Sequence, residues 1–347
     1  MKKVLLGMSG GVDSTVAAII LKEQGYEVIG ITFKFTNDFD PNDAIKVAET
    51  LNIKHYVVDY TETFKEKVID KFILDYNNGL TPNPCILCNR EVKFKFLYDN
   101  MKKYECDFIA TGHYARIIDG KLFKSSDLNK DQTYFLSQLT SVQLSHLILP
   151  LEGINKDKVR EIANKYNLIN ANKKDSYDIC FITDRFKDFI NKEGKSTNGD
   201  IINVLDGELL GKHNGLNNYT IGQRKGLNIG GTTDRLYVVG KNIKSNVLYV
   251  SLGDDSEYLV STSCLLTNVN LINKDKLTNV KAKFRYRQTE TDVIVDYLDN
   301  NEAIVKYPNG IKAVTPGQIC ALYNNDECIG SGIIKEVMKN NEKLWYL

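Results

Sequence analysis

The sequence has no apolar run long enough to cross a membrane. No stretch of about 18 consecutive apolar residues occurs in its 347 residues. The apolar stretch after Lys3 is too short for a signal peptide, and it runs directly into a glycine loop instead of a cleavage site. We therefore expect a cytoplasmic protein with no membrane partner, whose first residues form a core strand.

The chain also has almost no net charge. The 45 Lys and Arg residues almost balance the 44 Asp and Glu residues, which leaves a formal charge of +1. Nucleic-acid-binding proteins often show overall basicity. Any RNA contact made by this chain must therefore rely on locally clustered cations.

The pattern of the first half predicts a doubly wound α/β domain. Strand patterns alternate with amphipathic helical patterns, and such alternation is typical of a parallel sheet with right-handed crossovers. The strands are expected at 3–8, 27–35, 55–59 and 107–111, and the helices at 14–24, 40–51, 61–76, 91–103 and 155–168. This domain is expected to span residues 1–195.

The remainder of the chain reads as two smaller domains. Glycines cluster between 222 and 231 and helical periodicity disappears, which indicates a small central domain over 196–258. Short alternating strands separated by turn signals follow. They predict a C-terminal antiparallel β-barrel over 259–347.

A glycine-rich loop between the first strand and the first helix is a candidate phosphate site. Helix N-termini offer unpaired N–H groups to anions, and glycines allow close backbone approach. The loop lacks the lysine of the kinase and GTPase motif, and an aspartate there suits a bridging Mg²⁺. The candidate ATP-binding residues are Gly7, Met8, Ser9, Gly10, Gly11, Val12, Asp13 and Ser14.

Seven cysteines in a chain expected in the cytoplasm do not suggest a disulfide framework. Cys85 and Cys88 have the Cys-x-x-Cys spacing, which places both sulfurs within reach of one metal or of each other. Cys180 follows Lys173 and Lys174, which would favour a thiolate. No second close pair exists for a four-cysteine zinc site, and we interpret the other four cysteines as structural: Cys106, Cys264, Cys320 and Cys328.

Several separate segments together resemble the bacterial tRNA-specific 2-thiouridylases. The loop at 9–14 resembles the pyrophosphate loop of the wider ATP-pyrophosphatase superfamily, and the other segments follow in order along nearly the whole chain. They are 81–89, 110–114, 129–132, 174–181, 222–226, 285–288 and 315–318. The resemblance implies that ATP adenylates the 2-oxygen of wobble uridine 34 in tRNA, after which sulfur replaces that oxygen and AMP leaves.

The resemblance also implies roles for single residues. Cys180 would carry a persulfide supplied by a sulfur-relay protein or a cysteine desulfurase, and Cys88 would release the sulfur and end in a disulfide with Cys180. Phe33 and Gly112 would line the adenosine pocket, with Asp13 acting in catalysis. The residues implied to contact tRNA are Asn83, Pro84, Cys85, His113, Lys130, Asp131, Gln132, Arg285, Tyr286 and Gln318.

Two of these sites also have support from the residues themselves. Between 281 and 287 cations recur with period two, so a strand there would present four positive charges on one face, as a phosphate-tracking ribbon would. His113 follows a predicted strand at the edge where ligands bind in open α/β sheets. The plainer interpretation of the cations at 281–287 is a solvated face of the barrel. The plainer interpretation of His113 is a hydrogen-bonded residue at the end of a strand.

Cys85 departs from the family, which often has Asp at this position. It is either a spare or resolving thiol in persulfide chemistry, or one of three ligands, with Cys88 and Cys180, of a [4Fe-4S] cluster. Two rival functions also remain open at this point. One is an amide-forming ligase of the same superfamily, and the other is a tRNA-binding protein without catalytic activity.

Overall fold

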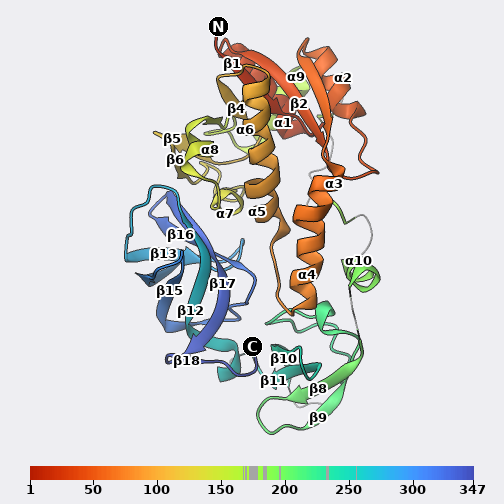
Figure 1. Cartoon of the computed structure of the whole chain (residues 1–347), viewed down its shortest axis with the longest axis vertical. Coiled ribbons are helices and arrows are strands. Elements are labelled where there is room, and N and C mark those ends of the chain that lie inside the picture. The colour runs from red at the N-terminus through yellow and green to blue at the C-terminus, as the bar shows by residue number, and fades with distance from the viewer. Residues whose placement is uncertain are drawn as a thin grey trace.

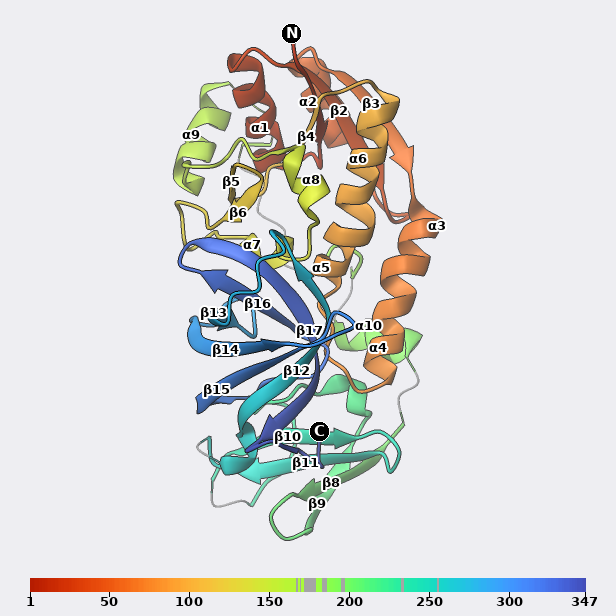
Figure 2. The ribbon, with the colours of Figure 1, turned by 60° about the vertical axis from the view of Figure 1, so that its left-hand side comes forward.

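A computed structural model describes residues 1–166, 168, 170–171, 179–182, 186–194, 197–231, 234–254 and 256–347. A sheet domain lies at one end of the elongated molecule, a small mixed domain lies at the other, and a β-barrel lies between them (Figures 1 and 2). Within the described residues no helix is long and apolar enough to cross a membrane.

The first domain is built on a five-stranded parallel sheet, as predicted. Its order is β3-β2-β1-β4-β7, and every neighbouring pair is parallel. The strands are β1 (Lys3–Gly7), β2 (Glu27–Lys34), β3 (Lys54–Asp59), β4 (Phe108–Ala110) and β7 (Leu147–Ile148). Alternate residues of β1 serve opposite cores, because Val4 and Leu6 pack on one face and Leu5 packs on the other.

Helices cover both faces of this sheet. Apolar residues of α1 (Val12–Glu23), α2 (Asn42–Thr50) and α9 (Lys156–Lys165) pack into the core that contains Val4. On the other face lie α6 (Phe94–Lys103) and α8 (Ser141–Ser145). The doubly wound prediction is thereby confirmed, and the predicted helices agree with the observed ones to within a few residues.

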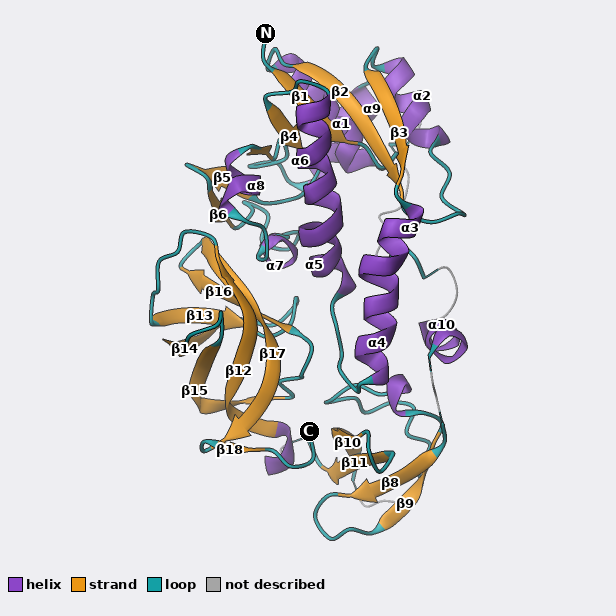
Figure 3. Ribbon diagram, in the orientation of Figure 1, coloured by secondary structure: helices purple, strands orange, loops and turns teal. Residues whose placement is uncertain are grey.

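Two helical rods lead away from the sheet and lie side by side (Figure 3). One contains α3 (Thr61–Phe64), the π-helical turn η1 (Lys65–Asp70) and α4 (Lys71–Asn77), and the other contains α5 (Pro84–Cys88), the π-helical turn η2 (Asn89–Lys93) and α6. Tyr60 stacks on Phe96 with ring centroids 3.8 Å apart, which joins the rods near the sheet.

The C-terminal domain is the predicted antiparallel barrel, and its six long strands close through a β12–β17 pairing. They are β12 (Val260–Leu271), β13 (Asn279–Lys283), β14 (Thr291–Tyr297), β15 (Ala303–Lys312), β16 (Ile319–Asn324) and β17 (Glu327–Lys339), with β18 (Glu342–Lys343) appended. The central domain has the sheet order β10-β11-β8-β9. Its strands are β8 (Gly199–Asn203), β9 (Leu209–His213), β10 (Leu236–Asn242) and β11 (Val247–Leu252), with α10 (Phe186–Glu193) before them and the short helices η3 (Leu216–Asn218) and η4 (Glu257–Leu259) after β9 and β11.

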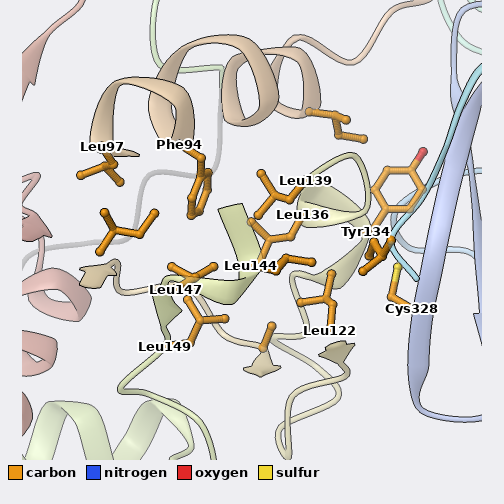
Figure 4. Packing of buried hydrophobic residues seen from close by; sticks show 14 of the residues in the cluster. Phe94, Leu97, Leu122, Tyr134, Leu136, Leu139, Leu144, Leu147, Leu149 and Cys328 are labelled. Atoms are coloured by element: carbon orange, nitrogen blue, oxygen red, sulfur yellow. The ribbon is translucent and has the colours of Figure 1, made fainter. Parts of the chain in front are cut away.

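The barrel is continuous with the sheet domain, which the sequence pattern did not predict. A hairpin of β5 (Arg116–Ile118) and β6 (Lys121–Phe123) pairs with β17, and α7 (Thr133–Leu136) lies beside it. Figure 4 shows that Leu122 and Tyr134 pack near Cys328 of β17, in the same cluster as Phe94 and Leu97 of α6. One apolar core therefore spans the junction between the two domains.

Candidate active site

The glycine loop leaves the N-terminus of α1 open for an anion. Helix α1 begins at Val12 with Gly11 as its N-cap, and no side chain caps it. Ser14 Oγ lies 3.3 Å from Ser9 Oγ and donates to the Gly11 carbonyl at 3.0 Å. Gly10 has φ +72°, and a Cβ there would lie 2.8 Å from Asp43 Cβ, so only glycine fits. The loop has the open amides and the two hydroxyls that a phosphate site requires.

Asp13 is held by two side chains that the sequence did not suggest. Lys156 Nζ donates to both carboxylate oxygens, at 2.7 and 2.9 Å, and the Tyr114 hydroxyl donates to Oδ1 at 2.6 Å. Lys156 is only 7% exposed although it stands at the start of α9. The negative charge of Asp13 is thus balanced by a lysine contributed from a distant helix.

Two further residues fix the backbone of the loop. Asn170 Nδ2 donates to the Gly10 carbonyl at 3.0 Å and to Thr15 Oγ1 at 2.8 Å, and Asn170 Oδ1 is buried with no hydrogen-bond partner among the described residues. A Cβ on Gly112 would lie 2.8 Å from the Ser14 amide nitrogen. Gly112 is therefore required for close packing of the loop after β4 against the glycine loop.

Phe33, predicted to line the adenosine pocket, lies at the end of β2 in an aromatic cluster. Its ring centroid is 5.5 Å from that of Tyr60, 5.8 Å from that of Phe35 and 6.2 Å from that of Phe96. The ring lies at the carboxyl end of the sheet, the edge from which the glycine loop also projects.

The cysteine pair stands on a short helix that its own sequence caps. Asn83 Oδ1 accepts from the Cys85 amide at 3.2 Å, and Pro84 occupies the first turn of α5. Cys85 is half-buried and Cys88 is buried. A π-helical turn follows immediately, a feature often found at functional sites.

The three candidate thiols lie within electrostatic range of one another and of Lys93. Burial raises the pKa of Cys88 to about 12, and Lys93 opposes this shift. Burial and then Cys180 raise the pKa of Cys85. Cys180 is exposed, yet desolvation by nearby protein raises its pKa against the effect of Lys93. Among the described residues, Lys93, which the sequence did not single out, acts on all three thiols.

The expected activation of Cys180 by Lys173 and Lys174 concerns residues outside the described part of the chain. The four other cysteines, Cys106, Cys264, Cys320 and Cys328, are buried, as expected for structural residues. Among the described residues, no group of three or more His, Cys, Asp or Glu side chains could hold a metal ion.

His113 follows β4 and is uncharged at neutral pH. Desolvation and then Lys93 lower the pKa of His113 well below its usual value. Its Nδ1 lies 2.8 Å from Thr111 Oγ1, and its ring faces Phe94 at 5.6 Å. A neutral imidazole can hydrogen-bond an RNA base, and this contact stays a prediction.

The predicted tRNA contacts at 130–132 lie next to the junction of the sheet domain and the barrel. Asp131 is buried and accepts from Thr133 Oγ1 at 2.7 Å and from the Ser125 amide at 3.0 Å. Gln132 Oε1 accepts from the Tyr114 amide at 2.8 Å, and Lys130 lies on the adjoining loop. Asp131 and Gln132 therefore hold this loop in its conformation through hydrogen bonds within the protein.

The predicted ribbon of four cations is wrong. Strand β13 ends at Lys283, and the chain then turns instead of continuing the alternation. Arg285 Nη2 points back and donates to three oxygens: Ile221 O at 2.9 Å, Ala313 O at 2.7 Å and Thr315 Oγ1 at 2.8 Å. Lys283 is paired with Glu290 at 3.5 Å. The arginine thus joins the barrel to the central domain.

Two other predicted RNA contacts also connect segments of the protein. Tyr286 packs on Phe135 with ring centroids 4.4 Å apart. The Gln318 side-chain amide donates to the Thr81 carbonyl, and the Thr81 amide donates to Pro316 O at 3.0 Å. The segment 315–318 therefore supports the loop that carries the cysteine pair.

Comparison with known proteins gives matches along the whole chain. Three family models match in succession: a tRNA methyl transferase HUP domain at 2–184, a tRNA methyl transferase PRC-barrel domain at 187–252 and an aminomethyltransferase beta-barrel domain at 261–334. The chain is 45% identical to the tRNA-specific 2-thiouridylase MnmA of Geobacillus thermodenitrificans, over 99% of this chain and 98% of that protein. It is 47% identical to the tRNA-specific 2-thiouridylase MnmA 1 of Geobacillus kaustophilus, over 97% and 96%.

Proposed function

Because this chain belongs to the family of tRNA-specific 2-thiouridylases, we infer that it is an ATP-dependent tRNA sulfurtransferase that makes 2-thiouridine. One observation carries the proposal: an open phosphate loop and three thiols around one lysine occur in the same domain. The family-model descriptions mention methyl transfer, but that reaction would use neither the phosphate loop nor the three thiols. The expected location is the cytoplasm, in keeping with seven free cysteines.

The first step is adenylation of the 2-oxygen of wobble uridine 34. That oxygen attacks the α-phosphate of ATP, the bond between the α- and β-phosphates breaks, and pyrophosphate leaves. The open amides of α1 and the hydroxyls of Ser9 and Ser14 hold the departing pyrophosphate. The resulting O-adenylyl group makes the uridine oxygen a good leaving group.

Magnesium fits this loop through a single carboxylate. Mg²⁺ is commonly held by one or two carboxylates together with substrate phosphates, and Asp13 is the carboxylate available in the loop. Lys156 contacts both carboxylate oxygens of Asp13, but the Asp13 side chain is still 30% exposed and would offer that exposed part to a metal-bound nucleotide. When bound, the ion neutralises phosphate charge.

The second step transfers sulfur. A persulfide on Cys180, supplied by a relay protein or a cysteine desulfurase, attacks C2 through its outer sulfur, and AMP leaves. Cys88 then attacks the Cys180 sulfur, the bond to the transferred sulfur breaks, and its electron pair completes the C2 thiocarbonyl. A Cys88–Cys180 disulfide remains, and an external thiol must reduce it before the next turnover.

Cys85 adds a third thiol, so an iron–sulfur cluster is the alternative to the persulfide. The described residues do not fit that alternative, because the three thiols form no group that could hold a metal ion, and clusters usually take four cysteine ligands. We assign Cys85 as a second resolving thiol. Iron and sulfide analysis of protein purified anaerobically decides the matter, since stoichiometric iron in active protein would overturn the persulfide route.

The test of the proposed function uses unmodified tRNA, ATP and a sulfur source, with 2-thiouridine and AMP measured together. Wild type is expected to form both products, whereas Cys88→Ser and Cys180→Ser each abolish 2-thiouridine. Cys106→Ser, which changes a buried cysteine outside the site, serves as the control. An amide-forming ligase would retain its activity in both cysteine variants, and a non-catalytic tRNA-binding protein would release no AMP.

A further inference from the structure

The turn at 222–226 in the central domain has no task in the proposed reaction. It begins directly after Ile221, whose carbonyl accepts from Arg285 of the barrel at 2.9 Å. The turn is therefore continuous with the part of the barrel where the family resemblance implies tRNA contacts, at Arg285 and Tyr286.

The turn is firmly built by Gln223. Its side-chain oxygen accepts from the Thr220 amide at 3.0 Å, and its side-chain nitrogen donates to the Lys225 carbonyl at 2.9 Å. Two backbone bonds then attach the turn to β10, from Gly222 N to Val238 O at 2.8 Å and from Val238 N to Gln223 O at 2.9 Å. This framework leaves the side chains of Arg224 and Lys225 exposed to solvent.

An open hollow of about 690 Å³ lies beside the turn, and Arg224 and Arg235 contribute to its wall. Neither arginine, nor Lys225, makes an ion pair or a side-chain hydrogen bond with another described residue. Asp234 is the one carboxylate in the described lining, and its Oδ1 accepts from the Arg235 amide at 2.6 Å. Elsewhere in the domain, by contrast, Lys212 is paired with Asp200.

We propose that this hollow, lined by the cations Arg224 and Arg235 with Lys225 exposed on the adjoining turn, binds backbone phosphates of the tRNA. The inference rests on the proposed function and adds the central domain to its RNA-binding surface. Exposed cations without partners favour binding of a polyanion, because they neutralise its phosphates and release the condensed counterions. The described lining contains no aromatic residue on which a base could stack, so the contact positions the RNA without reading its sequence.

The test compares two variants of the full chain. Arg224→Gln combined with Arg235→Gln should weaken binding of unmodified tRNA on the order of tenfold at 0.15 M salt and lower the slope of log K against log salt by about two. The matched control is Lys244→Gln. It removes an exposed cation beyond the far end of β10, which begins at the hollow with Leu236 and ends at Asn242.

Steady-state kinetics distinguish a failure of this inference from a failure of the proposed function on which it rests. The double variant should show a raised KM for tRNA, an unchanged kcat at saturating tRNA and an unchanged KM for ATP. If wild type thiolates tRNA but the double variant binds tRNA with the wild-type salt slope, the hollow has no such role. If wild type neither binds nor thiolates tRNA, the proposed function itself fails. A melting temperature equal to that of wild type establishes that the double variant is folded.

Discussion

Lys156 and Asp13 form a bidentate ion pair across 143 residues of sequence, with the lysine nitrogen 2.7 and 2.9 Å from the two carboxylate oxygens. The pair connects the first turn of α9 to the first turn of α1, directly at the open phosphate loop. Tyr114 adds a third contact to the same carboxylate at 2.6 Å. Asp13 is therefore fixed in place before any nucleotide arrives, a form of preorganisation that favours catalysis by fixed charges.

Replacing Lys156 with Met should lower the rate of AMP formation on the order of 100-fold, because Asp13 loses both its orientation and its balancing charge. Lys156→Arg should recover part of the rate, since it keeps the charge with a different geometry. The control is Lys158→Met, two residues along the same helix, whose side chain is 54% exposed and pairs with Glu161. Wild-type AMP formation in Lys156→Met would remove the lysine from the mechanism.

Asp13→Ala should abolish AMP formation while leaving tRNA binding intact. The carboxylate is proposed to act at the phosphate loop and not in RNA binding, so the two activities should separate. AMP release and a tRNA-binding titration on the same preparation provide the measurement. An equal loss of both would show that Asp13 serves only the fold of the loop.

Thiolation should rise with pH, because burial raises the pKa of Cys88 to about 12 and desolvation also raises the pKa values of Cys85 and Cys180. The reactive thiolate fraction at neutral pH is therefore smaller than for an unperturbed cysteine, and it grows as pH approaches the pKa. The rate of thiolation should increase steadily from pH 7 to 9 when it is measured under conditions in which AMP formation does not limit the rate.

Lys93→Met tests the cation in the same reaction. Without its positive charge the pKa values of all three thiols should rise further, so iodoacetamide labelling and thiolation should both slow several-fold at pH 8. AMP formation should change little. Lys95→Met, which alters an exposed lysine two residues further along the same helical rod, is the control. Equal labelling rates in wild type and Lys93→Met would contradict the assignment.

The sequence predicted those features that follow from local pattern. The strand–glycine–helix order located the phosphate loop. The short helix over Pro84–Cys88 was not among the predicted helices, although Asn83 and Pro84 cap its start. Hydrophobic periodicity shows which face of an element is buried, but not which polar side chain reaches a distant element. For that reason the contacts of Lys156 and Asn170 with the loop appear only in the folded chain.

The wrong ribbon at 281–287 has a related physical cause. Alternating cations predict a strand only if the backbone stays extended, and here the chain turns after Lys283. The turn lets Gln288 Oε1 accept from the Phe284 amide at 3.0 Å and lets Arg285 reach the central domain. Long-range hydrogen bonds of this kind override the local pattern, and no spacing rule in the sequence signals them.

Arg285 should therefore contribute to stability as well as to any contact with tRNA. Its guanidinium donates to Ile221 O, Ala313 O and Thr315 Oγ1, and desolvation lowers its pKa. Arg285→Gln removes a charged donor from three acceptors, two of them on the buried residues Ile221 and Thr315, and should cost roughly 2–4 kcal/mol of folding free energy. Arg287→Gln, at an exposed position nearby, should leave the melting temperature unchanged. If Arg285→Gln weakens tRNA binding without lowering the melting temperature, the arginine serves RNA alone, and the central domain must be held to the barrel by other contacts.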